Sequence, residues 1–99
     1  MTTPLRKIDH LLACLGEECG ELQQVVGKSL RFGLLSCNPI DDARSYNWVE
    51  LRKELHDIVA VYEMLCDEFD RVETIDRDLL DKKKEKVVKY FGVRGLSDE

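Results

Sequence analysis

The longest helical pattern in the chain is residues 8–30, IDHLLACLGEECGELQQVVGKSL. Its apolar residues recur at intervals of three and four, which is the spacing of one face of an α-helix. Thr3 followed by Pro4 resembles an N-cap and a first helical residue, and Gly33 is a natural stop. The pattern predicts one long amphipathic helix that begins near Thr3 and ends at Gly33.

Two further helical patterns follow. Residues 47–50, Asn-x-x-Glu, resemble a capping box, and the apolar spacing after them predicts a second helix that ends at about Asp70. A third pattern starts near Asp76 or Arg77 and stops at Gly92. No strand pattern competes with these helices. The loop at 34–46 between the first two helices is rich in turn-forming residues, and its length makes a functional role worth considering.

The fold class that these patterns predict is all-α. With 99 residues the chain has room for a single domain, residues 1–99. Two long helices and a shorter C-terminal helix make a thin core for one chain. We therefore expect a helical bundle whose four-helix core is completed by oligomerisation, as a homodimer or a homotetramer.

Composition excludes several classes of protein. Fifteen Lys and Arg against 20 Asp and Glu give a net charge of -5, which argues against a protein that binds nucleic acid through its phosphates. No apolar run is long enough for a membrane span or a secretory leader, so we expect a cytoplasmic protein that does not bind a membrane. The four cysteines are then expected to be reduced and buried.

Acidic residues fall within the apolar faces of both long helices. At about 100° per residue, Glu18 lies between Val25 and Leu11 inside the apolar stripe of the first helix. In the same helix Glu21 lies at the edge of the stripe and Glu17 one step further out. The second helix repeats this placement, with one acid inside its stripe and one at the margin, Glu54 and Asp57.

Ionised carboxylates are expensive to bury without a positive partner. Lys53 is adjacent to Glu54 and is expected to be rotated away from it, and Lys28 lies two turns from Glu21. Acids three apart share one helix face, so each helix can offer two oxygen ligands to a divalent cation. Hard oxygen ligands select Mg²⁺, with Mn²⁺ as the alternative. The plainer alternative is that these are ordinary acids at the edge of an amphipathic face.

The residues that carry these acids resemble a known signature. LGEECGEL at 15–22 and ELHDI at 54–58 look like the Glu-Glu-x-x-Glu and Glu-x-x-Asp motifs of the MazG-like all-α nucleoside triphosphate pyrophosphohydrolases. KSLRFGL at 28–34 and EKVVKYF at 85–91 are similar to segments of the short single-domain members, some of them phage-encoded. The resemblance covers most of the chain.

The resemblance implies hydrolysis of a nucleoside triphosphate between its α and β phosphates, which yields the monophosphate and pyrophosphate. By motif position, Glu18, Glu21, Glu54 and Asp57 become metal ligands, and Glu17 becomes a further ligand or the residue that orients the attacking water. Glu17 and Glu18 are accordingly the catalytic candidates. The resemblance also implies a four-helix bundle that is assembled across chains, in which residues of a neighbouring chain reach the nucleotide.

Cations and donors are needed for the phosphate oxygens that a metal does not hold. The candidates are Lys28, Arg31, Lys83, Lys86 and Asn47, for which a solvated helix face or, for Asn47, a helix cap is the alternative. Three functional hypotheses follow: a pyrophosphohydrolase that controls or cleans the nucleotide pool, a hydrolase of dUTP or phosphoribosyl-ATP from the same superfamily, and a non-enzymatic helical dimerisation module with a vestigial metal site.

Overall fold

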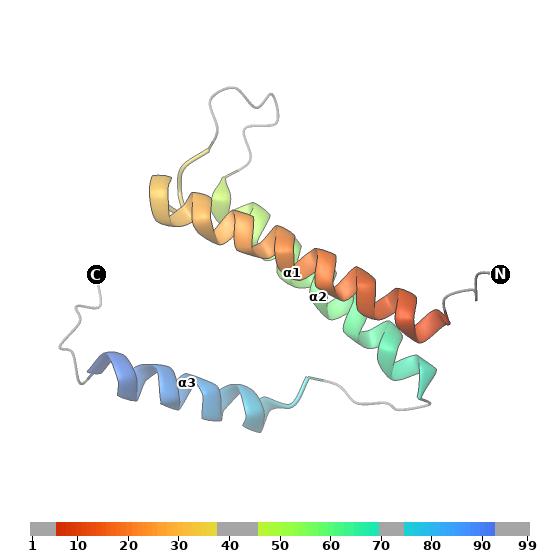
Figure 1. The fold of residues 1–99 in the computed structure, drawn as a ribbon. Coiled ribbons are helices and arrows are strands. Elements are labelled where there is room, and N and C mark those ends of the chain that lie inside the picture. The colour runs from red at the N-terminus through yellow and green to blue at the C-terminus, as the bar shows by residue number, and fades with distance from the viewer. Residues whose placement is uncertain (1–5, 38–45, 70–74, 93–99) are drawn as a thin grey trace.

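The computed structural model describes residues 6–37, 46–69 and 75–92, with the backbone alone described for the last two of these residues. It contains the three predicted helices in the predicted order (Figure 1): α1, Lys7–Phe32; α2, Asn47–Glu68; and α3, Arg77–Gly92. In the described ranges there is no strand, and Cys37 and Tyr46 form one isolated antiparallel bridge. The all-α prediction is therefore confirmed.

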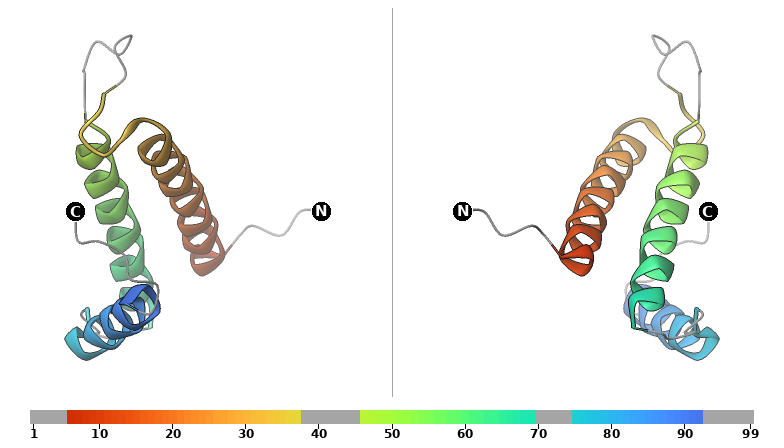
Figure 2. Two further views of the ribbon diagram at one scale, coloured as in Figure 1. Left: turned by 90° about the vertical axis from the view of Figure 1, so that its left-hand side faces the viewer. Right: turned by 90° about the vertical axis from the view of Figure 1, so that its right-hand side faces the viewer.

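Helices α1 and α2 form an antiparallel hairpin (Figures 1 and 2). Its apolar centre is small: Leu11 is 4% exposed and Val25 is 6% exposed. An ion pair lies toward each end of the hairpin, Lys7 Nζ to Glu68 Oε2 at 3.1 Å and Lys28 Nζ to Glu50 Oε2 at 3.0 Å. Because exposed ion pairs each contribute only about 0 to 1 kcal/mol, packing between the helices has to supply most of the hairpin's stability.

Gly33 ends α1 as the sequence predicts. Its φ of 96° lies in the region that glycine adopts without strain, and its N–H donates to the Ser29 carbonyl at 2.8 Å. At the other end the helix begins at Lys7, with Arg6 at the N-cap position and no side-chain cap. The predicted start of the helix near Thr3 is wrong, because Arg6 has an extended backbone; Thr3 and Pro4 themselves lie outside the described residues.

The predicted capping box at the start of α2 is wrong. Tyr46 occupies the N-cap position without a side-chain hydrogen bond, and Asn47 is the first helical residue. Glu50 does not complete the box, because its carboxylate pairs with Lys28 across the hairpin. Asn47 is only 6% exposed, and its side-chain Nδ2 donates a hydrogen bond to the Gly33 carbonyl at 2.9 Å. Asn47 therefore joins the end of α1 to the start of α2.

Helix α3 is separate from the hairpin (Figure 1): among the described residues it contacts neither α1 nor α2. The backbone N–H of Asp78 donates to Asp76 Oδ1 at 2.9 Å, so Asp76 caps its N-terminus. The large apolar residues described on this helix are exposed, namely Leu79, Leu80, Val87, Val88 and Tyr90. A four-helix core stays a prediction, since a single chain supplies only a two-helix hairpin and an unpacked third helix.

None of the four cysteines forms a disulfide, as expected, but the prediction that they are buried is wrong. Cys19 is exposed, and Cys14, Cys37 and Cys66 are half-buried, because a hairpin of two helices leaves most of each helix surface open. No described helix is both long enough and apolar enough to span a bilayer.

Replacement of Asn47 by alanine tests the junction between α1 and α2. We expect Asn47→Ala to lower the free energy of unfolding in urea by about 1 kcal/mol, because one buried hydrogen bond to the Gly33 carbonyl is lost. Gln23→Ala, at an exposed position of α1, is the control and is expected to change it by less than about 0.5 kcal/mol. Equal stability of Asn47→Ala and the wild type would contradict the role given to Asn47.

Candidate metal centre

Three predicted ligands converge between the two helices of the hairpin. Helix α1 presents Glu18 and Glu21, which are three residues apart and so share a face, and α2 presents Glu54 opposite them. One carboxylate oxygen from each lies within 4.8 Å of the other two. Glu18 is half-buried, Glu21 is exposed and the side chain of Glu54 is 12% exposed. This order of burial agrees with the positions predicted from the apolar stripes.

Two of the converging carboxylates each have an oxygen without a protein partner. Glu18 Oε2 and Glu54 Oε2 are buried and neither accepts a hydrogen bond. Buried polar atoms are nearly always paired, and a carboxylate in its ionised form can only accept. These two oxygens therefore require a cation or a proton between α1 and α2.

The pKa of Glu18 indicates the same need for a cation or a proton. Its pKa is raised above the ordinary 4.5, first by loss of solvent around the carboxylate and then by the negative charges of Glu21 and Asp57. Glu54 adds to the effect as a hydrogen-bond partner for the protonated form and through its charge. Each of these causes disfavours the ionised form. A cation between the carboxylates would lower the pKa of Glu18, because it favours the ionised form.

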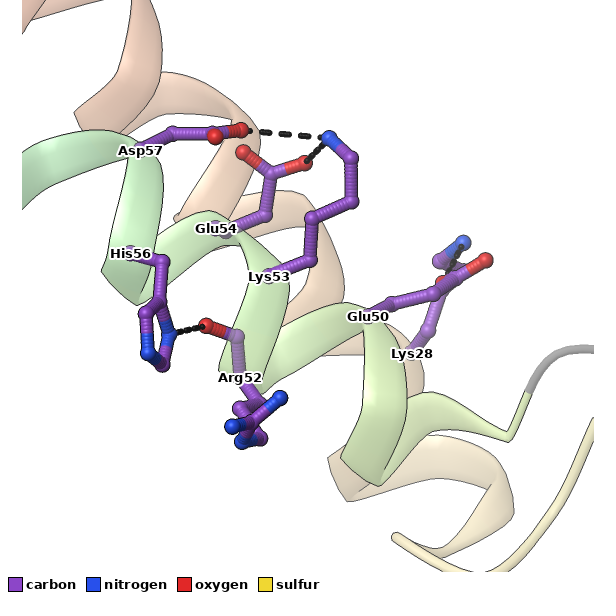
Figure 3. A network of polar contacts seen from close by, with 7 residues as sticks. All are labelled: Lys28, Glu50, Arg52, Lys53, Glu54, His56 and Asp57. Carbon is purple, nitrogen blue, oxygen red and sulfur yellow. Dashed lines mark hydrogen bonds and ion pairs between the residues drawn. The ribbon is translucent and has the colours of Figure 1, made fainter. Parts of the chain in front are cut away.

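Lys53 corrects the expectation that it is rotated away from Glu54. Its Nζ lies 3.1 Å from Asp57 Oδ2 and 3.6 Å from Glu54 Oε1 (Figure 3). The hydrogen bond to Asp57, followed by the charges of Asp57 and Glu54, raises the pKa of Lys53. The prediction failed because it considered only the direction of the Cα–Cβ bond, whereas the long lysine side chain can fold back over its own helix.

Asp57 and Glu17 are not among the three converging glutamates. The Asp57 side chain is 38% exposed and hydrogen-bonded to Lys53, and its carboxylate is not among the three that converge. Glu17 is exposed on α1. Their roles as ligand and water-orienting residue stay predictions.

An open hollow of about 370 Å³ adjoins the glutamates, and we call it the groove. Its lining combines acids with two lysines and comes from both helices: Glu21, Gln24, Val25, Lys28, Glu50, Lys53 and Glu54. Lys28, a predicted phosphate ligand, reaches it from α1 and pairs there with Glu50 (Figure 3). The groove therefore places positive charge beside the candidate metal ligands.

The other predicted phosphate ligands do not line this groove. The Arg31 guanidinium lies 5.5 Å from the centre of the Phe32 ring near the end of α1, and the Asn47 amide is bonded to Gly33. Lys83 and Lys86 are exposed on α3, which does not contact the hairpin. Within one chain, only Lys28 of the predicted set lies beside the glutamates, and substrate contact by the others stays a prediction.

Sequence reasoning missed two residues of this region, Glu50 and Lys53. A signal for Lys53 was present, because a lysine four residues from an aspartate on a helix commonly pairs with it. The partner of Glu50 lies 22 residues away on another helix, so only the packing of α1 on α2 reveals it.

Comparison of the chain with protein-family models, with curated proteins and with solved structures finds no match. The resemblance to the MazG-like superfamily accordingly depends on the motif residues alone.

The raised pKa of Glu18 predicts how metal-free stability depends on pH. Below about pH 4.5 the carboxyl is protonated in the folded and unfolded chains alike, and above its raised pKa the folded state carries the unfavourable charge. Stability should therefore fall as pH rises between these values. In EDTA, Glu18→Gln should be more stable to urea than the wild type near neutral pH, and the difference should disappear toward pH 4.5.

Glu17→Gln is the matched control for that experiment, since it removes the same charge from an exposed position one residue away. Its stability should follow that of the wild type across the pH range. A difference between Glu18→Gln and the wild type that does not vary with pH would contradict the electrostatic account of Glu18.

Proposed function

We propose that this protein is a metal-dependent nucleoside triphosphate pyrophosphohydrolase of the MazG-like type, acting in the cytoplasm on the nucleotide pool. The observation that carries the proposal is the convergence of Glu18, Glu21 and Glu54 with two buried carboxylate oxygens that lack partners. These glutamates also belong to the two sequence motifs, Glu18 and Glu21 to the first and Glu54 to the second. Three of the five acids that the two motifs include are thus also close together in space.

The donor set suits Mg²⁺ or Mn²⁺. All three converging groups are carboxylates, which are the ligands preferred by hard divalent cations, and no described His or Cys completes a nitrogen or sulfur site with them. A bound divalent cation would bridge the acidic site to the substrate phosphates and acidify the attacking water. The three carboxylates therefore suit such a cation by their chemistry and by their closeness to one another.

Each residue has a distinct part in this proposal. Glu18, Glu21 and Glu54 hold the cation, and Asp57 joins them from the margin. Glu17 either adds a further ligand or accepts a hydrogen bond from the attacking water and orients it. Lys28, which lines the groove 3.0 Å from Glu50, exchanges that partner for a phosphate oxygen of the nucleotide.

A second copy of the chain completes the fold in this proposal, as a homodimer or homotetramer. Helix α3 has no contact with the hairpin among the described residues, and Leu80 and Val87 are seven residues apart on one of its faces, 40% and 39% exposed. Packing of such faces between chains would extend the hairpin to a four-helix core. It would also allow Lys83 and Lys86 to reach the groove of a neighbouring chain.

Pyrophosphate release tests the activity. The four common ribonucleoside and four deoxyribonucleoside triphosphates and dUTP are incubated with the protein in Mg²⁺, in Mn²⁺ or in EDTA, and both products are identified. We expect metal-dependent formation of monophosphate and pyrophosphate. Glu54→Gln should reduce it by about 100-fold or more, because a metal ligand is lost.

Glu63→Gln, at an exposed position of α2, is the control and should retain activity. Release that persists in EDTA or in Glu54→Gln would contradict the metal-dependent mechanism. Formation of the diphosphate and orthophosphate would contradict cleavage between the α and β phosphates.

Light scattering tests the assembly. The wild-type mass should be at least twice the 11.5 kDa of one chain. Leu80→Glu combined with Val87→Glu should shift it toward one chain, because charges are placed in the apolar face of α3, whereas Lys82→Glu on the same helix should not. A wild-type mass of a single chain would contradict the assembly.

A further inference from the structure

Lys53 holds two of the carboxylates that the proposed function assigns to the metal. Its Nζ contacts Asp57 Oδ2 at 3.1 Å and Glu54 Oε1 at 3.6 Å (Figure 3). It leaves Glu54 Oε2 and Glu18 Oε2 without a partner. A single ammonium therefore neutralises the open side of the acidic cluster and leaves its inner side unsatisfied.

We propose that Lys53 is an exchangeable counter-ion: it occupies Glu54 and Asp57 in the metal-free protein, is displaced from them by the divalent cation, and then binds a phosphate group in the groove. The inference rests on the metal site of the proposed function. It adds a residue that neither motif includes, and it gives that residue one role before metal binding and another after it.

Competition for the same two carboxylates supports the displacement. A divalent cation that binds Glu54 and Asp57 would bind the two carboxylates whose Oε1 and Oδ2 the ammonium contacts. The cation has twice the charge and can also satisfy the inner oxygens of Glu18 and Glu54, which Lys53 does not contact. Because the Lys53 side chain is 67% exposed, little packing is lost when it leaves.

The position of Lys53 supports the second role. It lines the groove together with Lys28, so the released ammonium stays beside the space next to the glutamates. Its flexible four-carbon chain can turn about its bonds while the backbone of α2 stays fixed. Lys28 does not share the first role, because its partner is Glu50, which is not one of the converging carboxylates.

Lys53→Met tests both roles because they predict changes of opposite sign. In calorimetric titration of the full chain with Mg²⁺ or Mn²⁺, the variant should bind metal about threefold to tenfold more tightly than the wild type, because the competing ammonium is gone. In excess Mg²⁺, it should bind magnesium pyrophosphate about threefold to tenfold more weakly, because a phosphate ligand is gone. A purely structural role would not shift the two affinities in opposite directions.

Lys7→Met is the matched control, since it removes a lysine of similar exposure, 68%, that pairs with Glu68 elsewhere on the hairpin. It should leave both affinities at the wild-type value. If the wild type binds metal and Lys53→Met binds it equally or more weakly, the exchange is overturned while the proposed metal site stands. Tighter metal binding with unchanged pyrophosphate binding overturns the phosphate role. Absence of metal binding in both proteins overturns the inference and the proposed function together.

Discussion

Repulsion between carboxylates across the contact of α1 and α2 is the constraint on which this structure depends. Glu18 and Glu54 place oxygens in that contact, and both have one buried oxygen without a hydrogen-bond partner. Only Leu11 and Val25 are buried apolar residues among those described. A hairpin with so small an apolar centre has little stability to set against unpaired charge. The buried oxygens therefore require a cation or a proton between the two helices, and the metal of the proposed function would meet that need.

The residues that join the ends of the two helices are different from the residues that form the candidate site. Pairing of Lys7 with Glu68 toward one end, and the Asn47 bond to the Gly33 carbonyl at the other, fix the ends of the two helices. The middle is left to the carboxylates, whose mutual repulsion is expected to lower the stability of the fold near neutral pH when no cation is bound. Functional sites commonly sacrifice local stability in this way, and a ligand that binds only the folded state restores it.

Much of the fold could be predicted from the sequence because its signals are local. The apolar spacing predicts all three helices, and Gly33 predicts the end of α1. The helical periodicity also places Glu18 within the apolar stripe, where the structure has it half-buried. The errors have a different origin. The capping box at Asn47 does not form, because the Asn47 side chain instead donates a hydrogen bond to Gly33 at the end of α1. The prediction for Lys53 is wrong because the length of its side chain lets it reach Asp57. The packing of α3 on a second chain stays a prediction, because its described residues do not contact the hairpin and no local pattern encodes what covers it.

Thermal unfolding of the wild type tests whether the acidic pairs of α1 and α2 form one cation site. The midpoint is measured as Mg²⁺ or Mn²⁺ is added to protein treated with EDTA and dialysed, with NaCl of equal ionic strength as the reference. A cation site predicts a midpoint that rises with metal concentration and continues to rise above the dissociation constant of the site, because the metal binds the folded state alone. A midpoint that responds equally to the divalent salt and to NaCl would contradict it.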